Sequence, residues 1–484
     1  MDTGSVSHTM GPKKVPMAAE ESPQGTRFLR RLGLLDTAFL VIGAVVGSGI
    51  FMTPGLIASI LPSPGLLLTV WLVGGLIALC GALSFAELGA MYPEAGGQYV
   101  YIREAYGRGA AFLFGWAFFG FIMCGGLAAL AVAFAEFLGH FVPALSTAKV
   151  LFRAGAPGGL SYSLSAGQLV AAAAILLLTL VNSFGIRSGA TFQNVLTVIR
   201  LGTVAALVGL GVLVGAKAGA SNFHPLFPPG PAFPAVLKPL GLALVAVFWT
   251  YDGWYSVNCT AEEIRDPGRT IPRGLTFGVL AVTGIYVLVN LVYLLALPLA
   301  ELQGVVRVGE RAAAALFGGG GADFFSALVM VSVFGCLNAN LLFGPRVFYA
   351  MGRDGSFFRA MGRLGPRTRV PNAALWGQAA WSSVLCLSGT YESLYEYMVF
   401  ALLVFFAATG LAVIVLRRRA PQTARPYRAW GYPVVPLVFV ITCLAVFLNK
   451  IAAEPLLKSL AGLALLLAGI PVYAIWNAHK RRRA

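Results

Sequence analysis

The stretch DTAFLVIGAVVGSGIFMTPGLIASI at residues 36–60 sets the class of fold. It is longer than the roughly 20 apolar residues that cross a bilayer as a helix, and Gly47-Ser48-Gly49 interrupts it near its middle. Similar apolar runs recur as far as Asn477 with short polar connections, which predicts an all-α integral membrane protein of twelve spanning helices. The helices are expected near residues 36–60, 65–91, 109–141, 165–183, 190–215, 238–262, 275–299, 323–351, 372–389, 394–416, 432–450 and 455–477.

The composition excludes a water-soluble fold. Of the 484 residues, 58% are hydrophobic and only 11% are charged, against about 25% charged residues in typical soluble domains. The net charge of +16 would suit a nucleic-acid surface, but the basic residues do not gather into one patch with interleaved aromatics. They fall in alternate loops instead. We therefore expect membrane lipid around the protein and no nucleic-acid partner.

The distribution of Lys and Arg predicts the orientation in the membrane. With a cytoplasmic N-terminus, the inner segments carry 25 of the 35 basic residues and the outer loops 8, while Arg200 and Arg346 lie within helices. The positive-inside rule then places both termini in the cytoplasm of a multi-pass protein of the plasma (inner) membrane. The expected organisation is a cytoplasmic tail at 1–35, one twelve-helix domain at 36–477 and a basic cytoplasmic tail at 478–484.

A second interruption, Tyr251-Asp252-Gly253-Trp254, falls in the sixth expected helix at 238–262. The two broken helices are five apart, and an odd offset inverts the orientation of a helix across the membrane. Such a pair is typical of a 5+5 inverted repeat with broken helices 1 and 6. The repeats are expected at about 36–215 and 238–416, with helices 11 and 12 as peripheral additions.

Two breaks at mid-depth predict a binding site. Within hydrocarbon, unwound backbone persists only where it is buried in protein or lines a cavity. The half-helix that begins near Ile50 would aim free N–H groups at an anion. Val45 and Val46, together with Trp249 and Tyr251, would offer carbonyl oxygens to a cation. A zwitterion suits this arrangement, with its carboxylate at the N–H end and its ammonium at the carbonyl end.

The glycines of the first break admit two interpretations. Gly47 and Gly49 carry no side chain that would keep a carboxylate away from the backbone. Alternatively, they allow close packing between helices, as small residues in membrane helices often do. The counterpart in the sixth helix favours the binding site.

Four motifs extend this interpretation: VVGSGIF at 45–51, YPEAGGQYVYIREAYG at 92–107, FWTYDGWYSVNCTAEEIRDPGRTIP at 248–272 and NANLLFGPRVFYAMGRDG at 338–355. Together they resemble the amino acid-polyamine-organocation (APC) superfamily, and most closely its L-type amino acid transporters. The resemblance runs from about Gly33 to Arg419 with the motifs in the family's order. It implies the APC fold and an amino acid permease or exchanger that works by alternating access.

The resemblance also implies roles for single residues. Ser48 and Gly49 would hold the substrate carboxylate, and the carbonyls of Val45 and Trp249 would hold the ammonium group. The Trp249 ring would act as an outer gate, although a buried aromatic is more often a packing residue. The remaining residues of the expected substrate-binding set are Val46, Gly47, Tyr251, Asp252 and Gly253.

Arg200, in LTVIRLGT, stands where this family typically has a lysine on helix 5. The resemblance implies a cation that replaces the sodium ion of related transporters and bridges helices 1 and 8. Arginine stays charged in proteins, so proton coupling through this position is not expected. That favours sodium-independent exchange or facilitated movement over proton symport. The alternative is that Arg200 simply pairs with a carboxylate.

Other charged residues carry open alternatives. Asp252 would either favour a cationic substrate side chain or cap the half-helix that follows it. Glu87 and Arg346 are candidates for a pair with each other or for gate elements. The acidic and basic residues after helix 6 would form an inner gate or a solvated loop: Glu262, Glu263, Arg265 and Asp266. The stretch 92–107 is expected to form a short amphipathic element at the cytoplasmic mouth.

The loop between helices 3 and 4 and the four histidines bear on partners and on alternative functions. L-type transporters of animals usually link to a glycoprotein through a cysteine between helices 3 and 4, and this loop has none. We therefore expect a prokaryotic-type protein without a disulfide-linked heavy subunit, working as a monomer or weak homo-oligomer. The four histidines do not cluster as metal ligands or beside a nucleophile, so an enzyme, a metal and a cofactor are not expected. Neutral amino acid exchange remains in competition with cationic amino acid or polyamine exchange, and with an amino acid sensor.

Overall fold

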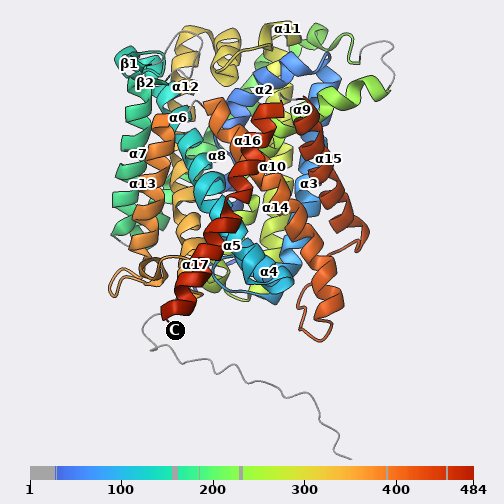
Figure 1. Ribbon diagram of the computed structural model, residues 1–484. Coiled ribbons are helices and arrows are strands. Elements are labelled where there is room, and N and C mark those ends of the chain that lie inside the picture. Colours follow the sequence, from blue (N-terminus) through green and yellow to red (C-terminus); the bar gives the residue numbers. More distant parts are fainter. Residues whose placement is uncertain are drawn as a thin grey trace, which may run out of the picture.

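The computed structural model describes residue 28 and residues 30–154, 162–184, 186–227, 233–388, 391–453 and 456–483. These residues form a bundle of long helices that run roughly in parallel (Figure 1). Within the described ranges, nine helices are long and apolar enough to cross a membrane, and a bent pair at the start of the chain makes ten. The chain is therefore a multi-pass membrane protein.

The first half of the bundle begins with the broken pair, in which α1 and α2 are bent by 46° at the break. The predicted third helix carries a short π-helical segment, η1, between α5 and α6. The elements of this half are α1 Leu34–Val45, α2 Gly49–Ile60, α3 Pro64–Met91, α5 Arg108–Ala117, η1 Phe118–Ile122, α6 Met123–Phe141, α7 Ala166–Ser183 and α8 Ile186–Ala218.

The second half departs from the sequence prediction in two elements. The predicted helix at 238–262 ends as an α-helix at Tyr251 and continues as the 3-10 helix η4. The predicted helix at 323–351 begins at Val308 and bends at Gly318, where φ is +75°. The elements are α9 Phe233–Tyr251, η4 Trp254–Glu263, α10 Pro267–Ala296, α12 Val308–Arg353, α13 Asn372–Ser388 and α14 Tyr391–Arg419.

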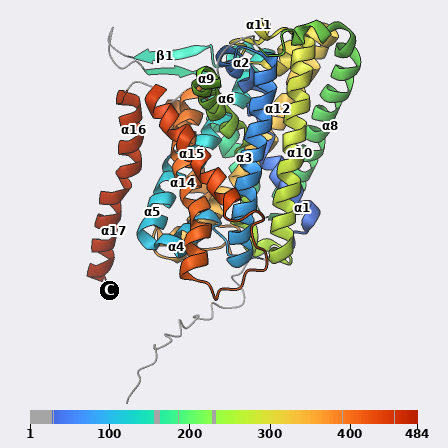
Figure 2. The same cartoon turned by 90° about the vertical axis from the view of Figure 1, so that its right-hand side faces the viewer.

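The last helices are α15 Val434–Ala453, α16 Leu456–Leu467 and α17 Gly469–Arg483, and α16 and α17 stand at one edge of the bundle (Figure 2). The predicted single helix at 455–477 is thus two short helices, and α13 has only 17 residues. Neither is among the nine long apolar helices of the described chain. The count of twelve spanning helices remains a prediction.

Short elements mark the two ends of the bundle. The hairpin end, uppermost in Figure 1, carries strands β1 Val150–Ala154 and β2 Tyr162–Ser165 and the short helix α11 Leu299–Leu302. The opposite end, which we name the α4 end, carries α4 Gln98–Tyr106 and the C-terminus. The described start of the chain lies there too, because the N–H groups of Arg31 and Leu32 donate to the Glu263 carbonyl at 2.8 and 3.0 Å. Short 3-10 turns complete the chain: η2 Pro143–Leu145, η3 Ala220–Phe223 and η5 Arg359–Gly362.

Local sequence explains where several helices begin. Ser63 accepts a hydrogen bond from the Leu66 N–H at 3.3 Å, with Pro64 in the first turn, where its missing N–H costs nothing. Ser165 and Gln168 form a reciprocal capping box at the start of α7. These caps satisfy N–H groups at the starts of α3 and α7 that hydrocarbon could not satisfy.

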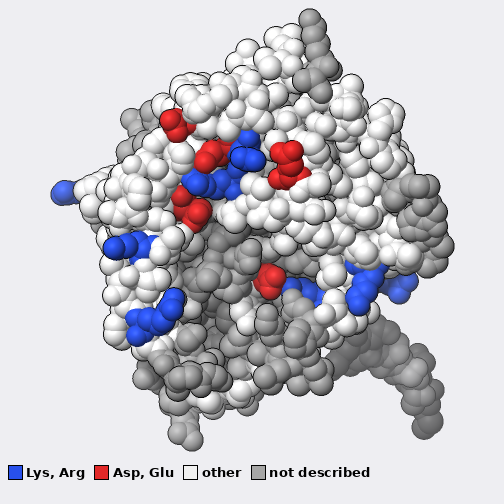
Figure 3. All heavy atoms as spheres, turned by 90° about the horizontal axis from the view of Figure 1, so that it is seen from above, with Lys and Arg blue, Asp and Glu red and all other residues white. Residues whose placement is uncertain are grey.

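Charge is sparse on the hairpin end. Seen onto this end, most of the visible described surface is uncharged, and several acidic side chains lie beside basic ones (Figure 3). Ion pairs here include Arg307 with Glu310 at 2.9 Å and Lys450 with Glu396 at 3.6 Å. The sequence prediction that this is the outer side rests on the same scarcity of basic residues.

Candidate functional site

The break between α1 and α2 leaves the last carbonyls of α1 without intrahelical partners. The sequence predicted these carbonyls to be unpaired, but side chains from other helices bond to them. The Tyr286 hydroxyl on α10 lies 2.9 Å from the Val45 carbonyl oxygen and 2.8 Å from the Thr250 carbonyl oxygen near the end of α9, and these two acceptors share its single proton. One buried phenol thus ties both broken helices together. A carbonyl has two lone pairs, so Val45 keeps capacity for a second donor.

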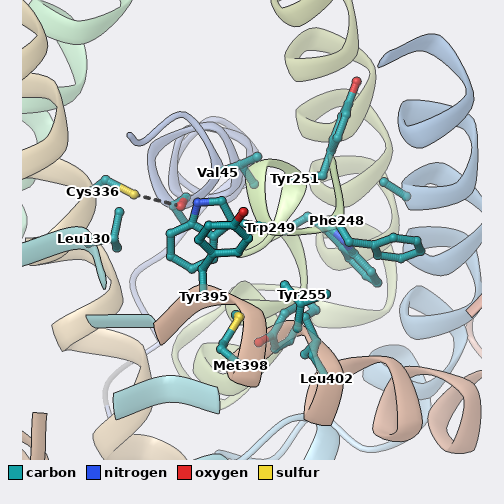
Figure 4. Close-up of a cluster of buried hydrophobic side chains, with 14 of the residues drawn as sticks. Val45, Leu130, Phe248, Trp249, Tyr251, Tyr255, Cys336, Tyr395, Met398 and Leu402 are labelled. Atoms are coloured by element: carbon teal, nitrogen blue, oxygen red, sulfur yellow. Dashed lines mark hydrogen bonds between the residues drawn. The ribbon is translucent and has the colours of Figure 1, made fainter. Parts of the chain in front are cut away.

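The next carbonyl, that of Ala44, is bonded from α12. The Cys336 thiol donates to it at 3.1 Å, and the Asn340 side-chain amide lies 3.4 Å away, one turn further along the helix. The bond from Cys336 is drawn as a dashed line in Figure 4. Neither residue was in the predicted site. The signal available was Asn340 within the quoted motif at 338–355, a polar side chain in an apolar run.

Arg200 on α8 bonds to the third carbonyl. Its guanidinium is fully buried, donates to the Gly43 carbonyl of α1 and donates to the Ser332 carbonyl of α12 at 2.9 Å. The structure therefore places this cation between helices 1 and 8, where the family resemblance implied it. Within the described part of the chain, no carboxylate forms an ion pair with Arg200. The alternative that Arg200 pairs with a structural carboxylate is therefore not supported.

Glycines bring the two breaks together. A Cβ atom on Gly49 would lie 2.6 Å from the Thr250 hydroxyl, and one on Gly47 would lie 2.7 Å from the Cys336 sulfur. Gly253 has φ of +103°, and its Cβ would lie 2.8 Å from the Ala44 carbonyl. The packing interpretation of these glycines therefore has direct geometric support. It does not exclude the binding interpretation, since the same approach leaves backbone exposed to the cavity between the helices.

A small cavity lies at the junction of the two breaks. Six predicted residues line it: Val45, Gly47, Ser48, Gly49, Trp249 and Asp252. The wall opposite the breaks is apolar and is formed by residues of η1 and α6. The sequence analysis singled out no residue in either of these two elements. The further lining residues are Ala44, Ile122, Met123, Gly126, Leu127, Leu130, Thr250, Tyr255, Cys336 and Asn340.

Trp249, the predicted gate, lies at this cavity and is 6% exposed. Its ring stacks on that of Tyr395 from α14, with centroids 5.5 Å apart and planes 27° apart (Figure 4). Tyr395 also lines a second space with Thr53 of α2 and Val305 of the segment after α11. The stacked pair therefore stands between the cavity and that space. Tyr395 was missed, because nothing in the local sequence marks it.

Three predicted residues do not line the cavity. Tyr251 turns toward α3, where its hydroxyl donates to the Trp71 carbonyl at 2.9 Å, and it borders a separate small pocket with Gly74. The Tyr251 side chain therefore does not border the cavity here, and the place of Tyr251 in the substrate site stays a prediction. Val46 is fully buried, with its N–H bonded to the Ile42 carbonyl at 2.9 Å, and Gly253 serves the close packing described above.

Asp252 lines the cavity, and its Oδ1 atom is buried without a hydrogen-bond partner among the described residues. The alternative that Asp252 caps the following half-helix stays a prediction, since η4 begins at Trp254 and the residue at its N-cap position is Gly253. A buried, unbonded carboxylate oxygen is costly unless a ligand or solvent reaches it.

Charged residues at the α4 end pair differently from the sequence prediction. Arg346 forms a two-pronged pair with Glu263, at 2.6 and 3.2 Å, and both side chains are less than 10% exposed. Glu87 pairs with Arg417 at 2.6 Å instead. The idea of a Glu87–Arg346 pair is therefore wrong, and Glu263 is not in a solvated loop.

The amphipathic element expected at 92–107 is present as α4. Gln98 donates to the Phe405 carbonyl of α14 at 2.9 Å, and the Tyr106 hydroxyl donates to the Ala408 carbonyl at 2.7 Å. Arg103 pairs with Asp354 after α12 at 2.6 Å. Thus α4 joins α14 to the end of α12 across the α4 end of the bundle.

A bundle of membrane-spanning helices whose two breaks meet around a small cavity is typical of membrane transport proteins. The profile of the amino acid permease family matches residues 32–467, and the chain belongs to that family, among the L-type-like members of the APC superfamily. It is 31% identical to the serine/threonine exchanger SteT of Bacillus subtilis (strain 168), over 94% of this chain and 98% of the relative. It is 28% identical to the human b(0,+)-type amino acid transporter 1, over 95% and 90% of the two chains. It is 29% identical to the mouse large neutral amino acids transporter small subunit 2, over 94% and 83%.

Proposed function

We propose that this protein is a secondary transporter that exchanges L-amino acids by alternating access. The observation that carries the proposal is the cavity at the two helix breaks, closed on one side by the stacked Trp249 and Tyr395 rings. A site enclosed at the junction of broken helices can open to one face or the other when the helices rock. The names of the relatives as exchangers and transporters of amino acids support the substrate class.

Backbone groups are proposed to hold the common part of every substrate. The first N–H groups of α2, at Gly49 and Ile50, have no acceptor within their helix and lie at its positive dipole end, which suits a carboxylate. The second lone pair of the Val45 carbonyl and the carbonyl of Trp249 would accept from the ammonium group. Because these are main-chain atoms, they recognise the amino acid backbone and not its side chain.

Arg200 is proposed to act as the fixed cation that makes sodium unnecessary. It holds α1 to α12 through carbonyl oxygens, the type of ligand that a sodium ion would use. A guanidinium does not give up its proton in proteins, so this link does not supply a proton-coupled step. Exchange that needs neither sodium nor a proton gradient follows from these two properties.

Neutral side chains suit the opposite wall, which is formed by Ile122, Met123, Leu127 and Leu130. We therefore propose neutral amino acids as the substrates. The second candidate is a cationic amino acid or polyamine, favoured by the unbonded Oδ1 of Asp252 at the cavity. A positively charged side chain would satisfy that oxygen.

The wider architecture is proposed as predicted from the sequence. It comprises twelve spanning helices with inverted repeats at about 36–215 and 238–416, and both termini in the cytoplasm of the plasma membrane. The part of the proposed cytoplasmic tail before residue 28 lies outside the described residues. We further propose that the protein works as a monomer or weak homo-oligomer without a disulfide-linked subunit, since all six cysteines are free and buried or half-buried.

The decisive experiment is uptake of labelled alanine, leucine and arginine into proteoliposomes that hold either unlabelled amino acid or buffer alone. Exchange predicts uptake only into the loaded vesicles, unchanged when sodium is replaced by potassium. Preference for alanine or leucine supports the neutral candidate, and preference for arginine supports the cationic one. Saturable binding without uptake under any load would instead establish the amino acid sensor and refute transport.

A further inference from the structure

The hairpin between α6 and α7 has one apolar and one polar face. Strands β1 and β2 are antiparallel, and their paired residues are Phe152 with Leu164, Arg153 with Ser163, and Ala154 with Tyr162. Paired residues share a face and successive residues alternate. One face therefore carries Phe152, Ala154, Tyr162 and Leu164, and the other carries Arg153 and Ser163. The apolar face is open, since Phe152 is 55% and Tyr162 is 41% exposed.

The base of the hairpin is held tightly. The Thr147 hydroxyl donates to Glu136 of α6, and the Ala166 N–H of α7 donates to the Lys149 carbonyl at 2.9 Å. Gly139 and Gly167 allow the connecting segment to approach both helices, because a Cβ atom on either would lie within 2.8 Å of it. The hairpin therefore projects from the bundle in a direction that its base sets.

That direction is sideways, at the level where the helices end (Figure 2). Strand β2 runs directly into α7, whose outward residues form a lipid-facing stripe: Leu169, Leu176, Leu177 and Leu180 are each more than 40% exposed. The hairpin is thus joined directly to a helix whose outer surface faces lipid. Two exposed basic residues, Lys149 and Arg153, accompany it.

We propose that the apolar face of this hairpin lies in the headgroup–acyl boundary of the bilayer, with Lys149 and Arg153 directed to lipid phosphates. A lone two-stranded hairpin is only marginally stable in water, so a covered face stabilises it. Its outer strand edges have unpaired N–H and C=O groups, which excludes the hydrocarbon interior but not the hydrated boundary. The amphipathic ring of Tyr162 favours that boundary, the apolar ring of Phe152 is removed from water there, and long basic side chains reach phosphates from it.

The test uses the full-length protein in nanodiscs of phosphatidylethanolamine and phosphatidylglycerol, with spin labels on single introduced cysteines. Phe152→Cys and Tyr162→Cys report the apolar face, and Arg153→Cys and Ser163→Cys are the matched controls on the polar face. Cys80 is replaced by alanine because it is the one native cysteine that is half-buried, while the other five are buried. Collision with oxygen, which concentrates in lipid, is compared with collision with a water-soluble nickel chelate.

The proposal expects a several-fold higher oxygen-to-nickel ratio at positions 152 and 162 than at 153 and 163. Equal ratios with free access of the nickel chelate at all four positions would show a water-exposed hairpin and overturn it. Labels at 152 and 162 that neither reagent reaches, but that become accessible at one protein per nanodisc, would show that a second copy covers the face, and would also overturn it. Amino acid uptake is not used as a readout, so failure here is distinct from failure of the proposed transport.

Discussion

Replacing Tyr286 by phenylalanine should weaken substrate binding more than any other single-atom change in α10. The substitution removes one hydroxyl, whose single proton is shared between the Val45 carbonyl at 2.9 Å and the Thr250 carbonyl at 2.8 Å. Two buried acceptors are then short of a donor, and an unsatisfied buried acceptor costs about 1 to 3 kcal/mol. The geometry of the two breaks therefore loses about 2 to 3 kcal/mol, which corresponds to roughly a 30- to 150-fold rise in Kd at 1.4 kcal/mol per tenfold.

Tyr293 provides a matched control for that experiment. It is equally buried, lies two turns further along α10, and donates only one bond, to the Ile50 carbonyl of α2 at 3.2 Å. Tyr293→Phe should raise Kd by about tenfold or less. The assay is equilibrium binding of labelled substrate to purified protein, with thermal unfolding measured for both variants. The reasoning is refuted if Tyr286→Phe binds substrate within threefold of the unmodified protein, or if the two variants lose affinity equally.

Three further substitutions test the site, and a fourth tests the ion pair between Glu263 and Arg346 at the α4 end. Gly49→Ala should abolish exchange while leaving membrane insertion intact, because the added Cβ atom would clash with Thr250. The control is Gly202→Ala, whose Cβ atom would meet no atom within 4 Å, and it should behave as the unmodified protein in the same uptake assay. Arg200→Lys should make exchange fall as the pH rises, since a buried lysine can lose its proton; a flat pH profile of uptake would contradict the argument. Asp252→Asn should lower arginine uptake at least tenfold relative to alanine uptake if the cationic candidate holds, and an unchanged ratio would dismiss it. Glu263→Gln should destabilise the protein by about 3 to 5 kcal/mol by leaving a buried guanidinium without its partner, and an unchanged melting temperature would show that the pair with Arg346 is not important for stability.

The amino-acid sequence by itself determined that this protein lies in a membrane, and it predicted where the first and sixth helices are interrupted. Apolar length, the scarcity of charge and the two glycine-containing interruptions are local properties, readable without knowing what packs where. They led to a membrane bundle and to six residues that line the cavity, from Val45 to Asp252. The interruption expected at Tyr251-Asp252-Gly253-Trp254 coincides with the end of α9 at Tyr251, but the continuation of the chain as a 3-10 helix was not expected.

The tertiary structure decided which groups complete those breaks. The carbonyls of Gly43, Ala44 and Val45 look free in the sequence, and each is bonded by a side chain that lies more than 150 residues away along the chain. Tyr251 stands beside the break yet turns to α3, because side-chain direction depends on local backbone geometry that a sequence motif does not specify. The partners of Glu87 and Arg346 were likewise settled by which helices meet. In a membrane every buried polar group needs a partner, but the sequence does not say which distant helix supplies it.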